Sequence, residues 1–139
     1  HQLKGRDGCR VPLPWTRSGS SFGFGDNGSW LPQPAWFADY AVDGQVDAPG
    51  SSLTLYRQAL ALRRRLHLAD SSVAWLDAED DEVIHFARAG GWQCLVNFSA
   101  HPRPAPPGEV LLSSSPIHDG MLPGEATVWL KGPPRVAGS

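Results

Sequence analysis

Residues 51–67 have apolar side chains at the spacing of an α-helix. The stripe runs through Leu55, Ala59, Leu62 and Leu66, and Tyr56 and Leu60 widen it. Pro49 and Gly50 block an extension upstream, and Ser51 or Ser52 can cap the free N–H groups of the first turn. Arginines at 63–65 place positive charge at the negative end of the helix dipole. The pattern predicts one amphipathic helix over 51–67.

Beyond Asp70 the apolar residues follow the pattern of β-strands. Short runs rich in Val, Ile, Phe and Trp, separated by polar or Pro/Gly breaks, lie at 73–76, 82–88, 92–99, 109–113 and 126–131. The clearest pair is a hairpin, because Gly90 and Gly91 supply the positive φ that a tight connection needs. These runs are typical of an antiparallel sheet, and we expect the tail at 133–139 to be disordered.

The first 50 residues show neither the helical nor the strand period. Gly, Pro, Ser and Trp dominate there, which is typical of a long loop. A loop of this length in a compact domain is uncommon and is usually functional. We therefore look for candidate chemistry in residues 1–50.

Composition excludes several classes of function. The chain has 139 residues and a net charge of -2, and its pI of about 6.2 offers no basic face to nucleic acid or to an anionic membrane. No apolar run approaches the ~18 residues that span a bilayer, and no secretory leader is recognisable. We expect a cytoplasmic protein, and because residue 1 is His rather than Met we expect a fragment. Cys9 and Cys94 are expected to be free thiols, and without a Cys or His cluster we expect no metal and no cofactor.

Several motifs that could mark a cofactor, glycosylation, catalytic or metal site are better explained as structural features or as coincidence. Residues 23–28 match G-x-G-x-x-G, but no strand precedes them and prolines prevent the helix that a dinucleotide site requires. The sequon at 97–99 lies in a strand pattern, so we interpret it as coincidental. His85 and His101 have no nucleophile beside them and are expected to be structural. The acidic run at 77–82 is expected to be a solvated turn.

The opening stretch carries a dense loop motif, Gly5-Arg6-Asp7-Gly8-Cys9-Arg10-Val11-Pro12-Leu13-Pro14-Trp15. It resembles the GRD-x-x-R-x-P-x-x-W loop of the α-glucosidase branch of glycoside hydrolase family 13, in the α-amylase superfamily. Later blocks at 30–34, 42–45 and 51–65 are similar to the family's W-L-P, N-V-x-x-Q and S-x-L-x-x-Y-R-x-L-x-x-L-R-R blocks, in order and spacing. The resemblance covers about His1 to Lys131. It implies a mixed fold, with the last loop and helix of a (β/α)8 barrel in residues 1–68 and then a small antiparallel β-sandwich over 69–132. In that fold the sandwich is expected to bury four aromatic side chains, Trp75, Phe86, Phe98 and Trp129.

The resemblance also implies a role for Arg10. In the family, the Arg before x-Pro closes the end of the −1 sugar subsite, together with an Asp from an earlier loop, and a guanidinium suits this task because its rigid fork holds carboxylate and hydroxyl groups. Arg6, Asp7 and Trp15 are expected to support the loop. Many relatives have Asn-Ala between Asp and Arg and a Thr after the Arg, whereas this chain has Gly8-Cys9 and Val11, a variant associated with actinobacterial enzymes.

The function that the resemblance implies is a retaining α-glucosidase or oligo-1,6-glucosidase acting on short α-glucosides such as maltose or isomaltose. Its two catalytic carboxylates belong to earlier barrel strands, so no catalytic residue is expected in this chain and the fragment alone should be inactive. The expected partners are the oligosaccharide and the N-terminal barrel of the same polypeptide. Three alternatives stay open: a stand-alone carbohydrate-binding β-module, a trehalose or sucrose isomerase-type relative, and a purely structural piece.

Overall fold

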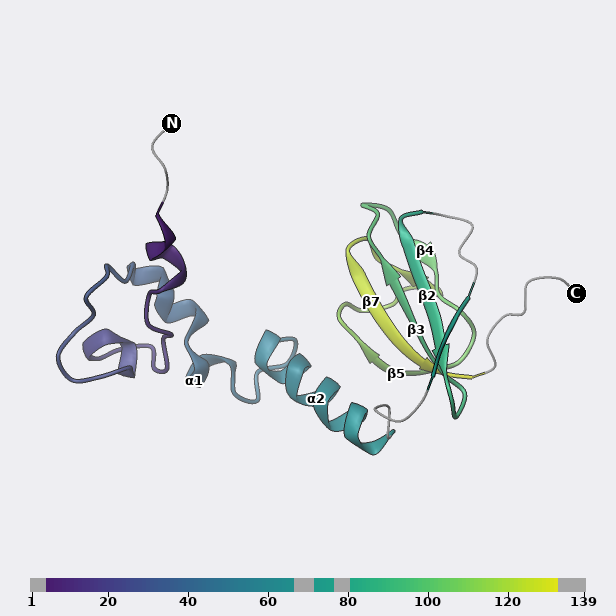
Figure 1. The fold of residues 1–139 in the computed structure, drawn as a ribbon, viewed down its shortest axis with the longest axis horizontal. Coiled ribbons are helices and arrows are strands. Elements are labelled where there is room, and N and C mark those ends of the chain that lie inside the picture. The colour runs from purple at the N-terminus through teal and green to yellow at the C-terminus, as the bar shows by residue number, and fades with distance from the viewer. Residues whose placement is uncertain (1–4, 67–71, 77–80, 133–139) are drawn as a thin grey trace, which may run out of the picture. The chain divides into compact units, whose positions relative to one another are not determined.

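The computed structural model describes residues 5–66, 72–76 and 81–132 and divides the chain into two units, His1–Thr54 and Leu55–Ser139 (Figure 1). Predictions for the tail at 133–139, and for most of the acidic run at 77–82, lie outside the described residues. No helix within the described ranges is long and apolar enough to cross a membrane.

Short helical turns take the place of longer elements in the first unit. They are η1 (Arg6–Cys9), η2 (Ser20–Gly23), η3 (Ala35–Tyr40) and α1 (Val42–Gln45). The described residues up to 50 contain no strand, as their lack of period predicts. The turns themselves escaped prediction because elements of four to six residues are too short to display a helical period.

Backbone hydrogen bonds fold this long loop back on itself. The N–H groups of Val42 and Asp43 donate to the carbonyls of Pro14 and Trp15, at 3.1 and 3.0 Å. The N–H of Trp15 donates in turn to the carbonyl of Phe22 at 2.8 Å. Pairing of this kind satisfies polar backbone groups that have no helix or sheet to join. The residues that follow Arg10 are thereby tied to η2 and α1.

The amphipathic helix α2 (Ser52–Arg65) lies where the sequence predicts one over 51–67. Its cap is Ser51, whose Oγ accepts the N–H of Thr54 at 3.1 Å and donates to the carbonyl of Gln45 at 2.8 Å. The side chain of Gln45 also accepts the N–H of Leu53, at 3.2 Å. Two free N–H groups of the first turn are thus satisfied by side chains, which fixes where the helix begins.

The second unit is built on a five-stranded antiparallel sheet of order β1-β2-β3-β7-β5 (Figure 1). Its strands are β1 (Val73–Trp75), β2 (Val83–Arg88), β3 (Trp92–Asn97), β5 (Glu109–Ser113) and β7 (Ala126–Lys131). A separate two-stranded sheet pairs β4 (Arg103–Pro104) with β6 (Met121–Leu122). The hairpin of β2 and β3 is confirmed, with φ of 86° at Gly90 and 71° at Gly91.

The two faces of the five-stranded sheet carry separate cores. One core consists of Leu95, Ala126, Val128 and Leu130 together with Leu122 of β6, all 5% exposed or less. The two-stranded sheet therefore forms the second layer, and the predicted sandwich has one large and one very small sheet. On the opposite face Trp92 and Cys94 are buried, packed by Leu66, Phe86, Val96, Leu111 and Trp129.

Two of the four aromatic side chains predicted to be buried are exposed. Trp75 is 73% exposed and Phe98 60%, so the prediction is wrong for both. Trp75 lies on β1 at the edge of the sheet, where its ring meets Phe86 edge-on with centroids 5.8 Å apart. Phe98 lies one residue beyond the end of β3 and is not among the side chains that pack on Trp92 and Cys94. Phe86 and Trp129 are half-buried.

A buried amide organises the chain after β3. Asn97 is 1% exposed, and its Nδ2 donates to the carbonyls of Pro123 at 2.8 Å and His101 at 2.9 Å. Its Oδ1 accepts from the N–H and the Oγ of Ser99, at 3.1 and 2.8 Å. An amide with these partners has no room for a glycan, so the sequon at 97–99 is structural, as its strand pattern predicts.

Candidate functional site

The structure brings two predicted site residues to one cavity in the first unit. Asp7 and Arg10 line a cavity of about 240 Å³. The other lining residues are Pro12, Ser29, Trp30 and Leu31. Oppositely charged side chains thus share a small cavity with apolar walls, which is the usual composition of a small-molecule site.

Local backbone geometry explains how Asp7 and Arg10 come together. They lie three residues apart across the 3-10 turn η1, and the N–H of Arg10 donates to the carbonyl of Asp7 at 2.9 Å. Among the residues that the structure describes, no side chain pairs with the Arg10 guanidinium. Its five donors are therefore available for an external carboxylate or hydroxyl group.

The far wall of the cavity comes from residues about 20 positions later in the sequence. Gln33 holds this wall in place, since its Nε2 donates to the carbonyl of Pro12 at 3.1 Å and contacts that of Ser21 at 3.4 Å. Ser29 Oγ is buried and has no hydrogen-bond partner among the described residues. Trp30 is 98% exposed.

The remaining predicted site residues do not reach the cavity. Within the described part of the chain, Arg6 and Trp15 are not among its lining residues. Trp15 is 47% exposed, and its backbone N–H bonds to Phe22. Their supporting role stays a prediction. Sequence reasoning missed Ser29 and Trp30, although the W-L-P block that contains Trp30 was the signal that could have identified it.

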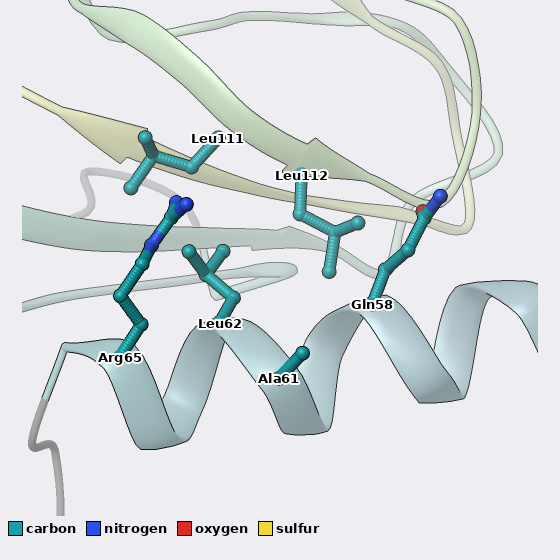
Figure 2. A pocket seen from close by; sticks show the side chains of 6 residues that line it. All are labelled: Gln58, Ala61, Leu62, Arg65, Leu111 and Leu112. Atoms are coloured by element: carbon teal, nitrogen blue, oxygen red, sulfur yellow. The ribbon is translucent and has the colours of Figure 1, made fainter.

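Two further cavities lie in the second unit and offer little chemistry. One of about 370 Å³ is lined by Gln58, Ala61, Leu62, Arg65, Leu111 and Leu112. Figure 2 shows Leu62 pointing from α2 toward the two leucines of β5, with Arg65 and Gln58 on either side. The other, of about 330 Å³, is mostly apolar and includes Leu55, Tyr56 and Trp129. Neither lining holds an acidic side chain or a histidine, so the hydroxyl groups of Ser114 and Thr127 in the second cavity have no base in the lining to activate them.

One thiol and one histidine of the described residues have surroundings that favour a structural role, Cys94 and His85. Both cysteines are free, Cys9 exposed and Cys94 buried. Burial raises the pKa of the Cys94 thiol from 9.0 to about 12, although a hydrogen bond with Trp129 lowers it slightly, so the thiol is neutral and a poor nucleophile. His85 Nε2 lies 2.9 Å from Gln93 Oε1, which agrees with a structural role. No group of three or more potential ligands for a metal ion occurs among the described residues.

Comparison with known proteins identifies the family. The sequence profile of the family described as "Domain of unknown function (DUF3459)" matches residues 35–129. A probable α-glucosidase of Rhizobium meliloti (strain 1021) is 35% identical over 101 residues, which are 70% of this chain and 18% of that protein. The chain therefore spans less than a fifth of this relative.

Solved structures of longer enzymes also match most of this chain. The crystal structure of the α-glucosyl transfer enzyme XgtA matches 94% of this chain and 26% of its own, with a TM-score of 0.71 and 33% identity. Isomaltulose synthase from Klebsiella sp. LX3 matches 91% of this chain and 26% of its own, with a TM-score of 0.75 and 19% identity, a likeness of fold alone. These relatives are thus a probable α-glucosidase, an α-glucosyl transfer enzyme and an isomaltulose synthase.

Proposed function

We propose that this chain, which belongs to the DUF3459 domain family, forms the C-terminal part of a retaining α-glucosidase that releases terminal α-linked glucose from short oligosaccharides. Its finer assignment is to the oligo-1,6-glucosidase-like enzymes of actinobacterial type, on the Gly8-Cys9 and Val11 variant of the loop motif. One observation carries the proposal. Asp7 and Arg10 face one small cavity, and the Arg10 guanidinium has no partner within the described residues.

In this proposal the chain binds the sugar and contributes no catalytic residue. A retaining glycosidase needs a nucleophilic carboxylate and an acid about 5 Å apart, and both belong to the N-terminal barrel. Arg10 would close the sugar subsite, with one edge of its guanidinium on a carboxylate and the other on hydroxyl groups of the terminal glucose. Charge-assisted hydrogen bonds of this type hold the sugar while it distorts toward the transition state.

α-Glucosyl transfer is the second candidate, favoured by the 33% identity to XgtA over nearly the whole chain. Transfer and hydrolysis share the glycosyl-enzyme intermediate and differ in whether a sugar hydroxyl or water attacks it. The arrangement around Arg10 serves both, because it acts on the donor glucose. Product analysis with maltose or isomaltose separates them: glucose alone indicates hydrolysis, and longer oligosaccharides indicate transfer.

The test uses the full-length enzyme that carries this chain. Arg10→Ala should lower kcat/KM on maltose or isomaltose at least ~10-fold, since each lost charge-assisted hydrogen bond costs ~1.5–3 kcal/mol. Arg10→Lys should recover little, because a point charge does not replace the planar fork. Arg64→Ala, an exposed arginine on α2, is the matched control and should change nothing. If kcat/KM is unchanged in Arg10→Ala, Arg10 does not bind the terminal glucose and its assignment to the sugar subsite is wrong.

A further inference from the structure

We propose that Asn27 is a site of spontaneous deamidation, where the backbone nitrogen of Gly28 attacks the side-chain amide and converts the residue to aspartate and isoaspartate. The two residues are adjacent in the loop between η2 and η3. The chemical step does not depend on the proposed function. Its consequence for the Arg10 cavity rests on that function.

The reaction needs water and no enzyme. The nitrogen of Gly28 forms a bond to Cγ of Asn27, and the bond from Cγ to Nδ2 breaks. The amide nitrogen leaves as ammonia and takes up the proton that the attacking nitrogen gives off, which leaves a cyclic succinimide. Water then opens this ring. Opening at Cγ gives aspartate, and opening at the backbone carbonyl of Asn27 gives isoaspartate, in which the main chain runs through the former side chain.

Gly28 leaves the approach to the Asn27 amide open. A side chain at this position would crowd the attack, and glycine has none. A Cβ placed on Gly28 would meet nothing within 4 Å, so no described residue restricts the peptide there. The φ of Gly28 is 80°, in the region that glycine adopts without strain. The backbone nitrogen is therefore free to turn toward Cγ.

Asn27 is exposed, and no hydrogen bond holds its side chain. Both Asn27 and Gly28 are exposed to water. Among the residues that the structure describes, none accepts a hydrogen bond from the Asn27 amide or donates one to it. No interaction of the side chain has to break before the attack, so the reaction proceeds from the native state without local unfolding.

Asn97 provides the contrast within the same chain. It is 1% exposed, and its Nδ2 donates to the carbonyls of Pro123 and His101 at 2.8 and 2.9 Å. The residue after it is Phe98, whose side chain crowds the backbone nitrogen that would attack. Deamidation of Asn97 would break buried hydrogen bonds, which is costly. We therefore expect Asn97 to keep its amide under conditions in which Asn27 loses it.

The modified residue lies close in sequence to one wall of the Arg10 cavity. Ser29, two residues after Asn27, lines this cavity. Further along the same segment, Gln33 donates to the carbonyl of Pro12 at 3.1 Å. Isoaspartate adds a carbon atom to the main chain ahead of Ser29, so the wall loses part of its preorganisation. We expect the KM for maltose to rise about 2- to 10-fold, the range that corresponds to ordering one more side chain on binding.

The test incubates the full-length enzyme at pH 8 and at pH 6 and follows the peptide that contains Asn27. Mass spectrometry should show its amide replaced by a carboxylate, and labelling with isoaspartyl methyltransferase should detect the isoaspartate. The change should be faster at pH 8, because the attacking nitrogen must lose its proton. The peptide that contains Asn97 should stay unchanged in the same digest.

Asn27→Gln is the matched variant for kinetics. It keeps an amide at this position, but the attack would have to close a larger ring, which forms much more slowly. The KM for maltose should rise in the incubated wild type and stay constant in incubated Asn27→Gln. A rise of equal size in both proteins would show that the change in KM arises elsewhere in the enzyme, and the effect on the cavity would be wrong.

The outcomes separate the deamidation site from the proposed function. If Asn27 keeps its amide in the native enzyme and loses it only in urea, the rest of the enzyme holds the loop, and Asn27 is not a site of native deamidation. Equal rates at Asn27 and Asn97 would overturn the assignment as well, because the local structure would then have no effect. If Asn27 deamidates and Arg10→Ala leaves kcat/KM unchanged, the modification site stands and the proposed function fails.

Discussion

The side-chain amide of Gln33 donates a hydrogen bond of 3.1 Å to the carbonyl oxygen of Pro12. This bond spans 21 residues and connects the loop that carries Arg10 to the loop that carries Trp30. Both loops lack regular secondary structure beyond short turns, so side-chain contacts of this type determine the shape of the cavity.

Replacing Gln33 with Met keeps the length of the side chain and removes its donor. We expect kcat/KM to fall about 3- to 10-fold, mainly through KM, because a hydrogen bond worth about 0.5–1.5 kcal/mol no longer holds the two walls together. Gln33→Glu should not restore activity, since a carboxylate does not donate to the Pro12 carbonyl. Gln58→Met, an exposed change on α2, is the control for steady-state kinetics. Full activity in Gln33→Met would show that the bond does not shape the site.

Two leucines of α2 provide a matched pair for the packing of the helix. Leu62 is 6% exposed and points toward Leu111 and Leu112 (Figure 2), whereas Leu60 is 46% exposed. Leu62→Ala should lower the free energy of unfolding by about 2–4 kcal/mol, and Leu60→Ala by less than about 1 kcal/mol. Urea denaturation of the enzyme followed by circular dichroism measures both. Equal losses would mean that the helix packs on another face.

Sequence periodicity predicted α2 and the β2–β3 hairpin because each is determined by local features. The helix has its stripe and its serine cap, and the hairpin has Gly90 and Gly91 with positive φ. Alternation along a strand assigns residues to two faces but does not say how well each face is covered, so Trp75 and Phe98 were assigned to the interior wrongly.

The candidate site depends on residues that are close in the sequence and on others that are not, and the roles given to Arg10 and Asp7 stay predictions. Arg10 and Asp7 stand in one short motif, and the loop pattern was enough to select them. Trp30 is a lining residue of the same cavity from a loop about 20 residues away, and a hydrogen bond from Gln33 to Pro12 joins the two loops. Spacing along the chain does not show that the two loops meet, although the W-L-P block marks the loop that contains Trp30.

Removing the Asn97 amide should be among the most damaging single changes to the second unit. Asn97→Ala leaves the carbonyls of His101 and Pro123 and the Ser99 hydroxyl without their buried partner. We expect a loss of about 2–4 kcal/mol in the free energy of unfolding, because unsatisfied buried polar groups cost about 1–3 kcal/mol each and part of the loss is recovered by relaxation. Asn27→Ala, an exposed asparagine, is the control. A change in melting temperature no larger than in the control would contradict the role given to this amide.

The buried thiol predicts how stability changes at alkaline pH. Burial raises the pKa of Cys94 from 9.0 to about 12, so above about pH 9 the unfolded chain releases a proton that the folded chain keeps. The unfolded state then binds fewer protons than the folded state, and stability falls as pH rises, by up to about 1.4 kcal/mol per pH unit between 9 and 12. Cys94→Ala should flatten this part of the curve while lowering stability at neutral pH through its cavity. Urea denaturation at pH 8, 9.5 and 10.5 measures the slope.

The same burial predicts which of the two thiols reacts with a thiol reagent at pH 8. Cys9 is exposed and should react quickly, and Cys94 should react only after denaturation. Cys9→Ser isolates the buried thiol, whose modification rate should then follow the opening of the sheet rather than the reagent concentration. Rapid labelling of Cys94 in native Cys9→Ser would contradict its burial, since the thiol is 3% exposed. It would mean that solvent reaches the face of the sheet that carries Trp92 and Trp129.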